Sequence, residues 1–219
     1  MFRLLVFDWD GTLMDSEARI VSSAIAAFAD LGLSPRSPEA IRGIIGLGLP
    51  EAMQALYPGL AEDRYATIID RYRHHFLEAD ATPMPLFPGV AQTLTRLRAE
   101  GYLLAVATGK SRRGLDRALA ETGLGGLFEV TRCADETRSK PHPQMLLEVM
   151  GALAVPAAQT LMIGDSEYDL QMATDAEVAA VGVGYGVQGC ERLLHYRPLA
   201  CFDRIEELHP WLLAQEPTI

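Results

Sequence analysis

Short apolar runs alternate with helical stretches along most of this chain. Four such runs are Leu4–Phe7, Tyr102–Ala107, Thr160–Ile163 and Val178–Val183, and a weaker one lies near Phe128–Val130. Apolar runs of this length are typical of strands that are buried on both faces, as in parallel sheets. Helices between such strands form right-handed crossovers. The chain is therefore expected to have an α/β fold, with a parallel sheet of five or slightly more strands flanked by helices.

The residues between the first two runs have a different pattern. Apolar residues keep helical spacing from Ser16, a candidate N-cap, to Phe76. The proline-rich segment Thr82–Gly89 cannot continue a helix and is interpreted as a linker. We therefore expect two domains: a core of residues 1–14 and 88–219, and an α-helical cap domain of residues 15–87, inserted after the first strand. Two links between them would form a hinge.

Composition excludes several classes of protein. Of the 219 residues, 49% are hydrophobic, which is enough for a complete core. The formal net charge of -10 argues against a nucleic-acid partner, which would require a basic face. No apolar stretch is long enough to span a bilayer, so no membrane association is expected. The assembly is expected to be a monomer or a homodimer.

The cysteines bear on the compartment. Cys133, Cys190 and Cys201 are odd in number and widely spaced, and no Cys-x-x-Cys pair occurs. This pattern predicts neither a disulfide framework nor a zinc site. A reducing, cytoplasmic location is therefore expected.

Two carboxylates follow the first apolar run, in Asp8-Trp9-Asp10-Gly11-Thr12. Side chains alternate across a strand, so Asp8 and Asp10 are expected to face one way and Trp9 the other. The carboxyl ends of parallel strands are where open α/β sheets bind ligands. Two acids there could hold a hard cation, or one could attack a substrate while the other moves a proton.

Three further polar segments follow later strands or begin helices: Thr108-Gly109-Lys110-Ser111, Lys140-Pro141-His142-Pro143 and Gly164-Asp165-Ser166-Glu167-Tyr168-Asp169. Each has an ordinary structural explanation as a turn, a solvated lysine or a helix cap. A threonine hydroxyl and backbone N–H groups at a helix start also suit a phosphate oxygen, and a lysine suits its charge. Capping explains Asp169 well, but it does not explain an acid, Asp165, at the end of a buried strand.

In this order and context, the four segments resemble the four motifs of the haloacid dehalogenase-like superfamily. The resemblance covers essentially the whole chain. It implies a Rossmann-like core, and the helical block is similar to the small cap of the subfamily that contains phosphoglycolate phosphatase, β-phosphoglucomutase and haloacid dehalogenase. Haloacid dehalogenases lack the second acid of the first motif, so Asp10 favours phosphoryl transfer.

The resemblance also implies roles for individual residues. Asp8 would be the nucleophile, and Asp10 the general acid and then the base. Mg²⁺ would be bound by the Asp8 carboxylate, the Asp10 carbonyl and Asp165, with Asp169 acting through water. The remaining phosphate oxygens would be held by Thr108, Gly109 and Lys140.

The expected function is that of a Mg²⁺-dependent phosphatase that hydrolyses a small phosphorylated metabolite, such as a phosphoglycolate-like monoester, through an aspartyl-phosphate. An inorganic pyrophosphatase or a phosphomutase of the same family is the alternative. The mutase branch carries a cap histidine where this chain has Ile20. The alternative from another class is a catalytically silent binding or regulatory protein.

Substrate selection is expected to lie in the cap. Arg42 and the loop residues Gly46, Leu47 and Gly48 are the candidates, because glycines let the backbone approach a ligand. Lys110, Arg112 and Arg113 are expected at the pocket rim or in solvent.

Overall fold

The computed structural model describes residues 1–215 and contains a parallel sheet at its centre. The described residues form six strands in the order β3-β2-β1-β4-β5-β6. The strands are β1 (Leu4–Phe7), β2 (Leu103–Thr108), β3 (Val130–Cys133), β4 (Thr160–Gly164), β5 (Ala179–Val183) and β6 (Cys201–Phe202). All the pairings are parallel, so the predicted α/β fold is confirmed.

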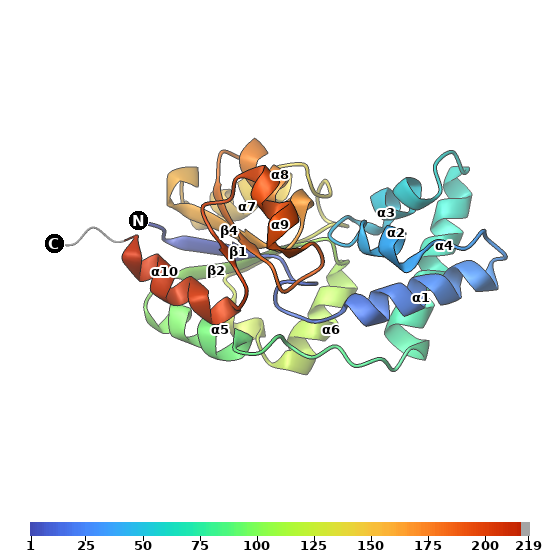
Figure 1. Cartoon of the computed structure of the whole chain (residues 1–219), viewed down its shortest axis with the longest axis horizontal. Helices are drawn as coiled ribbons and strands as arrows, with labels where there is room; N and C mark the ends of the chain where they lie inside the picture. The colour runs from blue at the N-terminus through green and yellow to red at the C-terminus, as the bar shows by residue number, and fades with distance from the viewer. Residues whose placement is uncertain (216–219) are drawn as a thin grey trace.

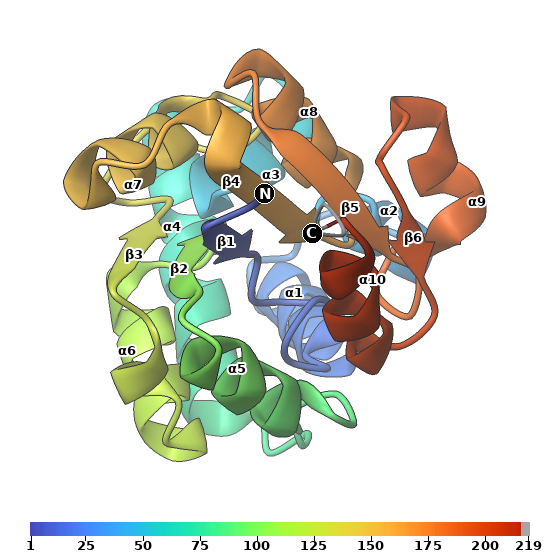
Figure 2. The same ribbon diagram turned by 90° about the vertical axis from the view of Figure 1, so that its left-hand side faces the viewer.

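Helices cover both faces of the sheet (Figure 2). One face is covered by α5 (Val90–Ala99), α6 (Arg112–Thr122) and α10 (Leu208–Ala214). The other face is covered by α7 (Gln144–Leu153) and α8 (Glu167–Asp175). The short helices of this domain are η2 (Gly125–Leu127), η3 (Ala157–Gln159), α9 (Gly189–Leu193), η4 (Leu194–Tyr196) and η5 (Ile205–Glu207).

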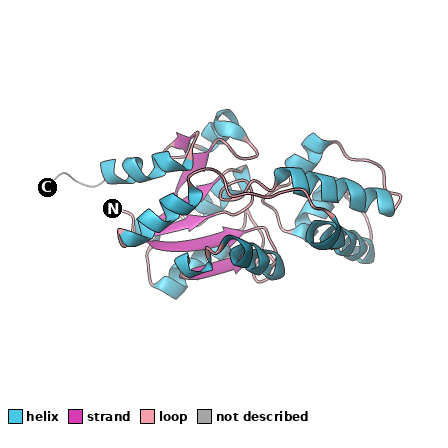
Figure 3. Ribbon diagram, turned by 90° about the horizontal axis from the view of Figure 1, so that it is seen from below, coloured by secondary structure: helices cyan, strands magenta, loops and turns pink. Residues whose placement is uncertain are grey.

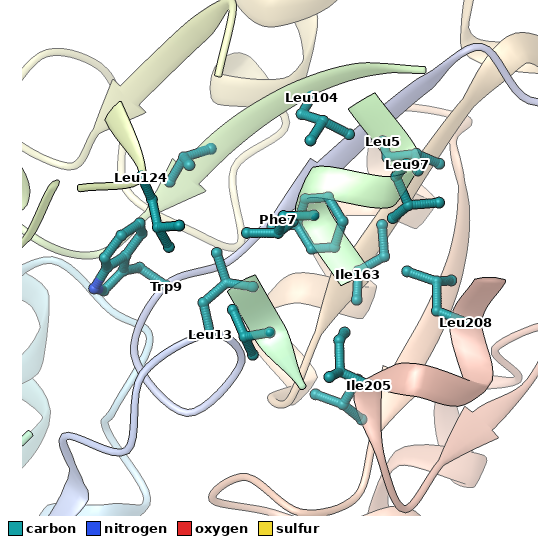
Figure 4. Close-up of a cluster of buried hydrophobic side chains, with 14 of the residues drawn as sticks. Leu5, Phe7, Trp9, Leu13, Leu97, Leu104, Leu124, Ile163, Ile205 and Leu208 are labelled. Atoms are coloured by element: carbon teal, nitrogen blue, oxygen red, sulfur yellow. The ribbon is translucent and has the colours of Figure 1, made fainter. Parts of the chain in front are cut away.

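The first strand shows why this sheet is buried on both faces. Leu5 and Phe7 point into one apolar cluster, while Leu4 and Val6 point into the other. Figure 4 shows the first cluster, in which Trp9 continues the face of Leu5 and Phe7. An apolar side chain contributes about 1.5–3 kcal/mol when it is fully buried, so both faces of the strand stabilise its central position.

The helical block lies beside the carboxyl ends of the strands, as Figures 1 and 3 show. It consists of α1 (Glu17–Asp30), α2 (Pro38–Arg42), α3 (Leu49–Leu56), α4 (Glu62–His74) and the π-helical turn η1 (His75–Ala79). These helices bury a separate apolar cluster, with Phe28, Ile41 and Ile68 at its centre. The exact cap boundaries at residues 15 and 87 stay a prediction.

The structure corrects the expectation for Ser16. This residue precedes α1, but its hydroxyl makes no capping hydrogen bond. The hydroxyl instead donates to Oδ1 of Asp10, at 2.5 Å. The sequence pattern of a cap was therefore a misleading guide, because the carboxylate of Asp10, which lies outside the helix, accepts from the same hydroxyl.

The expectation for the cysteines was also wrong, because Cys190 and Cys201 form a disulfide. Helix α9 folds back over the end of the sheet, and β6 pairs Cys201 with Gly182, so the two sulfurs meet. A tertiary approach of this kind has no spacing signature in the sequence. The cysteine pattern thus no longer supports a reducing compartment. Within the described residues, no helix has the length and apolar character that crossing a membrane requires.

Candidate active site

The pairing of β1 with its two neighbours brings the polar segments together. Phe7 is in register with Val106 of β2 and with Ile163 of β4. The backbone N–H of Asp8 donates to the carbonyl of Ile163, at 2.9 Å, and extends this pairing by one residue. Asp8 therefore lies at the same sheet edge as Thr108 and Asp165, as the strand pattern predicts.

Three carboxylates form a buried cluster at this edge. Oxygen atoms of Asp8, Asp165 and Asp169 lie within 4.8 Å of one another, and all three side chains are buried. Carboxylate oxygens are the ligands that hard divalent cations prefer. The residues present therefore fit a divalent cation.

Lys140 is the cation within this cluster. Its Nζ lies 2.8 Å from Oδ1 of Asp8 and 2.6 Å from Oδ1 of Asp169, and its side chain is fully buried. Apart from this ion pair, the described residues offer no hydrogen bond to either carboxylate oxygen of Asp8. When the three carboxylates are ionised, one ammonium does not balance them, so the cluster has a negative charge that a metal ion could balance.

Burial and the neighbouring charges shift the pKa values of these groups. Burial raises the pKa of Asp8 to about 7, and the negative charges of Asp169 and Asp10 add to this rise while Lys140 opposes it. Burial and the charges of Asp8 and Asp169 also raise the pKa of Asp165 well above its usual range. Burial alone would lower the pKa of Lys140, but Asp169 and Asp8 raise it, so the ammonium stays charged.

The carboxylate of Asp165 is held by its surroundings. The Thr12 hydroxyl donates to its Oδ1 at 2.9 Å, and the Val187 N–H donates to its Oδ2 at 2.8 Å. Gly11 allows this approach, because a Cβ built there would lie 2.1 Å from Oδ2 of Asp165. Thr12 and Gly11 of the first motif thus orient an acid of the fourth.

Asp169 is fixed in a second way. The backbone N–H and the hydroxyl of Ser166 both donate to its Oδ2, at 3.1 and 2.7 Å, and form a capping box at the start of α8. Its other oxygen pairs with Lys140. The capping role considered for Asp169 is therefore present together with its place in the cluster.

Asp10 lies apart from the cluster and has different partners. The Nζ of Lys110 is 2.9 Å from its Oδ1 and 3.1 Å from its Oδ2. The same Nζ lies 4.7 Å from the ring centroid of Phe76, in the cap. Asp10 and Lys110 both line a cavity between the cap helices and the core, which we call the cap cavity.

Lys110 was expected at the pocket rim or in solvent; it lines the cap cavity, so only the solvent alternative was wrong. Its side chain is only 6% exposed. Its signal was present in the sequence, because it follows the strand-end residue Thr108 by two positions and so lies at the edge that holds Asp10. A sequence offers no means of distinguishing such a lysine from a solvated one.

A comparison with protein families identifies the family of this chain. Residues 5–183 match the model of the haloacid dehalogenase-like hydrolases. The chain belongs to this family of hydrolases.

Relatives and solved structures agree with this assignment. A probable phosphatase, IndB, from Dickeya dadantii is 37% identical, with 94% of this chain and 91% of the relative covered. The phosphoglycolate phosphatase of Haemophilus influenzae is 31% identical, with 94% and 96% covered. A solved structure described as a predicted phosphoglycolate phosphatase from Haemophilus somnus has a TM-score of 0.83 and 28% identity, with 96% and 98% covered. The chain is thus a phosphatase of the family, a phosphoric monoester hydrolase.

In this hydrolase the cap loop at residues 43–48 lies directly against the core. The Gly48 N–H donates to the Ser139 hydroxyl at 2.7 Å, and the Tyr168 hydroxyl donates to the Gly43 carbonyl at 2.8 Å. A Cβ built on Gly109 would lie 2.5 Å from the Gly46 carbonyl oxygen. Gly109 is therefore the point where the second motif and the cap loop meet.

The candidate substrate-selecting residues of the hydrolase separate into two groups. Gly46 and Leu47 line the cap cavity, whereas Gly48 is not among its lining residues and bonds to Ser139 of the core. Arg42 does not line this cavity in the described structure; its guanidinium pairs with Glu17 and Glu39 and is 41% exposed.

Proposed function

We propose that this hydrolase is a Mg²⁺-dependent phosphatase that cleaves a small phosphomonoester through an aspartyl-phosphate. The observation that carries the proposal is that the two acids of the first motif have different surroundings. Asp8 faces the buried carboxylates and Lys140, whereas Asp10 faces Ser16, Lys110 and the cap cavity. A nucleophile and a proton carrier need such different surroundings.

In the first step, an oxygen of Asp8 attacks phosphorus and the bond from phosphorus to the alcohol oxygen breaks. Asp10 gives its proton to that oxygen, so the alcohol leaves as a neutral molecule. The Asp8 oxygens suit attack, because no hydrogen-bond donor other than Lys140 occupies them among the described residues. Lys140 holds the charge of the transferring group through its ammonium.

In the second step, Asp10 takes a proton from water, and the water oxygen attacks phosphorus. The bond between Asp8 and phosphorus then breaks, which releases inorganic phosphate and restores both acids. Thr108 and the Gly109 N–H would hold phosphate oxygens at the start of α6. Mg²⁺ would be held by Asp8, the Asp10 carbonyl and Asp165, with Asp169 behind water, and would neutralise charge on the phosphate.

The two-step reaction is tested by phosphate release and by trapping of the intermediate. Purified protein should release nitrophenol from p-nitrophenyl phosphate with Mg²⁺ and lose this activity in EDTA. Acid-quenched samples should carry one phosphoryl group in the peptide that contains Asp8, detected by mass spectrometry. Asp8→Asn should remove it, and the matched control Asp116→Asn, at a side chain that is 60% exposed, should not.

A panel of phosphorylated metabolites tests the substrate class. Phosphoglycolate is the first compound of the panel, because several relatives are named phosphoglycolate phosphatase. Pyrophosphate and hexose phosphates test the pyrophosphatase and mutase alternatives. Activity on no compound, with or without Mg²⁺, would instead support a silent binding protein.

A further inference from the structure

The cap cavity has an unusual chemical character for a site that handles phosphate. It has a volume of about 80 Å³, several times the roughly 10–15 Å³ that a single water needs. Its lining is mainly apolar side chains of the cap. The lining includes Ile20, Ile45, Leu47, Met53, Tyr72 and Phe76.

Charged groups are few in this lining. Among the described residues, only Asp10, Arg73 and Lys110 contribute a charge. The Arg73 side chain is 43% exposed and lies 3.4 Å from Asp70, so it belongs to the outer rim. The Lys110 ammonium already binds both oxygens of Asp10 and lies over the Phe76 ring. The cavity therefore offers no unpaired, buried cation to a second anionic group of a substrate, such as a carboxylate.

The position of Asp10 connects this cavity to the reaction. In the proposed reaction Asp10 protonates the leaving alcohol, so the alcohol oxygen must lie next to its carboxylate. Asp10 is also part of the cavity wall. The organic group attached to that oxygen therefore extends from Asp10 into the apolar space.

Two aromatic rings form part of the cap wall of this space. Tyr72 and Phe76 are stacked with their ring centroids 5.6 Å apart, and both are buried. A flat apolar group placed beside them would gain contact area and lose little hydration. A carboxylate in the same place would lose its hydration and would find no unpaired, buried cation in the lining.

We infer that the natural substrate is a phosphomonoester of an uncharged, apolar alcohol of about the size of one ring, whose organic part fills the cap cavity. This inference rests on the proposed phosphatase function and adds its substrate class. It distinguishes the chain from a hydrolase of phosphoglycolate, whose organic part is a carboxylate.

Three substrates of graded polarity test the inference. We would measure kcat/KM with Mg²⁺ for 2-phenylethyl phosphate, ethyl phosphate and phosphoglycolate. The first two have alcohols of similar basicity, so their ratio reports the apolar contact alone. The expected kcat/KM for 2-phenylethyl phosphate is at least about tenfold above each of the others, because even one methylene in a hydrophobic pocket has an effect of that order. Smaller ratios would overturn the inference.

Hydrolysis of p-nitrophenyl phosphate distinguishes a failure of the inferred substrate class from a failure of the proposed phosphatase function. An enzyme that hydrolyses it without preferring 2-phenylethyl phosphate contradicts the substrate class and leaves the phosphatase function intact. Protein that hydrolyses no phosphomonoester contradicts both.

A charged substitution in the cavity wall tests the location. Ile44→Lys places an ammonium at a half-buried lining residue, and Ile25→Lys places one at a side chain that is 43% exposed and outside the lining. Ile44→Lys should lower the ratio of kcat/KM for 2-phenylethyl phosphate over phosphoglycolate by roughly tenfold. Ile25→Lys should leave it unchanged. If thermal melting shows that Ile44→Lys does not fold, Leu47→Lys replaces it. An unchanged ratio in a folded cavity variant would overturn the assignment.

Discussion

The ammonium of Lys110 contacts both carboxylate oxygens of Asp10, at 2.9 and 3.1 Å, across 100 residues of sequence. This ion pair is nearly excluded from solvent, with side-chain exposures of 6% for Lys110 and 12% for Asp10. It holds the proton carrier in one orientation. Because the ammonium also lies over the Phe76 ring, the pair connects the core to the cap.

Replacement of Lys110 should therefore weaken proton transfer. We expect Lys110→Met to lower kcat for an alkyl phosphate roughly 10- to 100-fold, within the usual contribution of a general acid. The loss should be smaller for p-nitrophenyl phosphate, whose leaving group needs no proton. Steady-state kinetics on both substrates, with Arg113→Met as the matched control at a 77% exposed side chain, provide the measurement.

A double-variant cycle identifies the route of this effect. If Lys110 acts through Asp10, adding Lys110→Met to Asp10→Asn should cost almost nothing further. Additive losses would mean that Lys110 contacts the substrate by itself.

The Asp8→Asn variant should lose turnover and keep its fold. The amide has nearly the shape of the carboxylate but is a far poorer nucleophile, so kcat should fall by more than roughly 1,000-fold. Circular dichroism should be unchanged. Substantial residual turnover in protein free of wild-type contamination would remove Asp8 from the nucleophilic role.

The metal-free enzyme should become less stable as pH rises. Burial and neighbouring charges raise the pKa of Asp8 from 3.8 to about 7. Between these values the folded chain holds a proton that the unfolded chain has released, so the free energy of unfolding falls as pH rises through this window. Melting curves in EDTA from pH 5 to 8 measure the slope, which Asp8→Asn should reduce.

Mg²⁺ should counteract this loss most strongly at the alkaline end of the window. A cation binds the deprotonated carboxylates, so the rise in Tm on adding Mg²⁺ should be larger at pH 8 than at pH 5.5. An increase in Tm that does not depend on pH would show that the cation binds elsewhere.

The contact of Gly109 with the cap loop predicts a steric effect. A Cβ at Gly109 would lie 2.5 Å from the Gly46 carbonyl oxygen and 2.6 Å from that of Leu47. Gly109→Ala should therefore hold the cap away from the core and lower kcat/KM about tenfold for every substrate. Gly126→Ala is the control, since its Cβ would meet no atom within 4 Å. An increase in the radius of gyration by small-angle scattering should accompany the loss, and normal kinetics in Gly109→Ala would contradict it.

The placement of the catalytic segments at strand ends and helix starts was predictable from the sequence, because it depends on local patterns of residues. The four strand-end or helix-start segments follow from apolar runs and turn residues, and parallel pairing brings Asp8, Thr108 and Asp165 to one edge. The helical character of the cap was predictable for the same reason, since its apolar residues recur at helical spacing.

Contacts that depend on how the chain packs followed no such rule. The pairing of Cys190 with Cys201 depends on how α9 folds over β6, and the bond from Ser16 to Asp10 competes with a helix cap. The burial of Lys110 was not predictable, because a lysine is buried only where a carboxylate pairs with it, and that partner lies 100 residues away.

By itself, the sequence determined the α/β class, the inserted helical block and the acids Asp8 and Asp165 at the sheet edge, because strand and helix periodicity act over a few residues. Only the tertiary structure decided which side chains meet between cap and core. It placed Lys110 in an ion pair with Asp10, left Arg42 outside the lining of the cap cavity and gave this cavity its apolar wall. The physical reason is that these contacts depend on the packing of two separately formed cores, and no local spacing records how two such surfaces face each other.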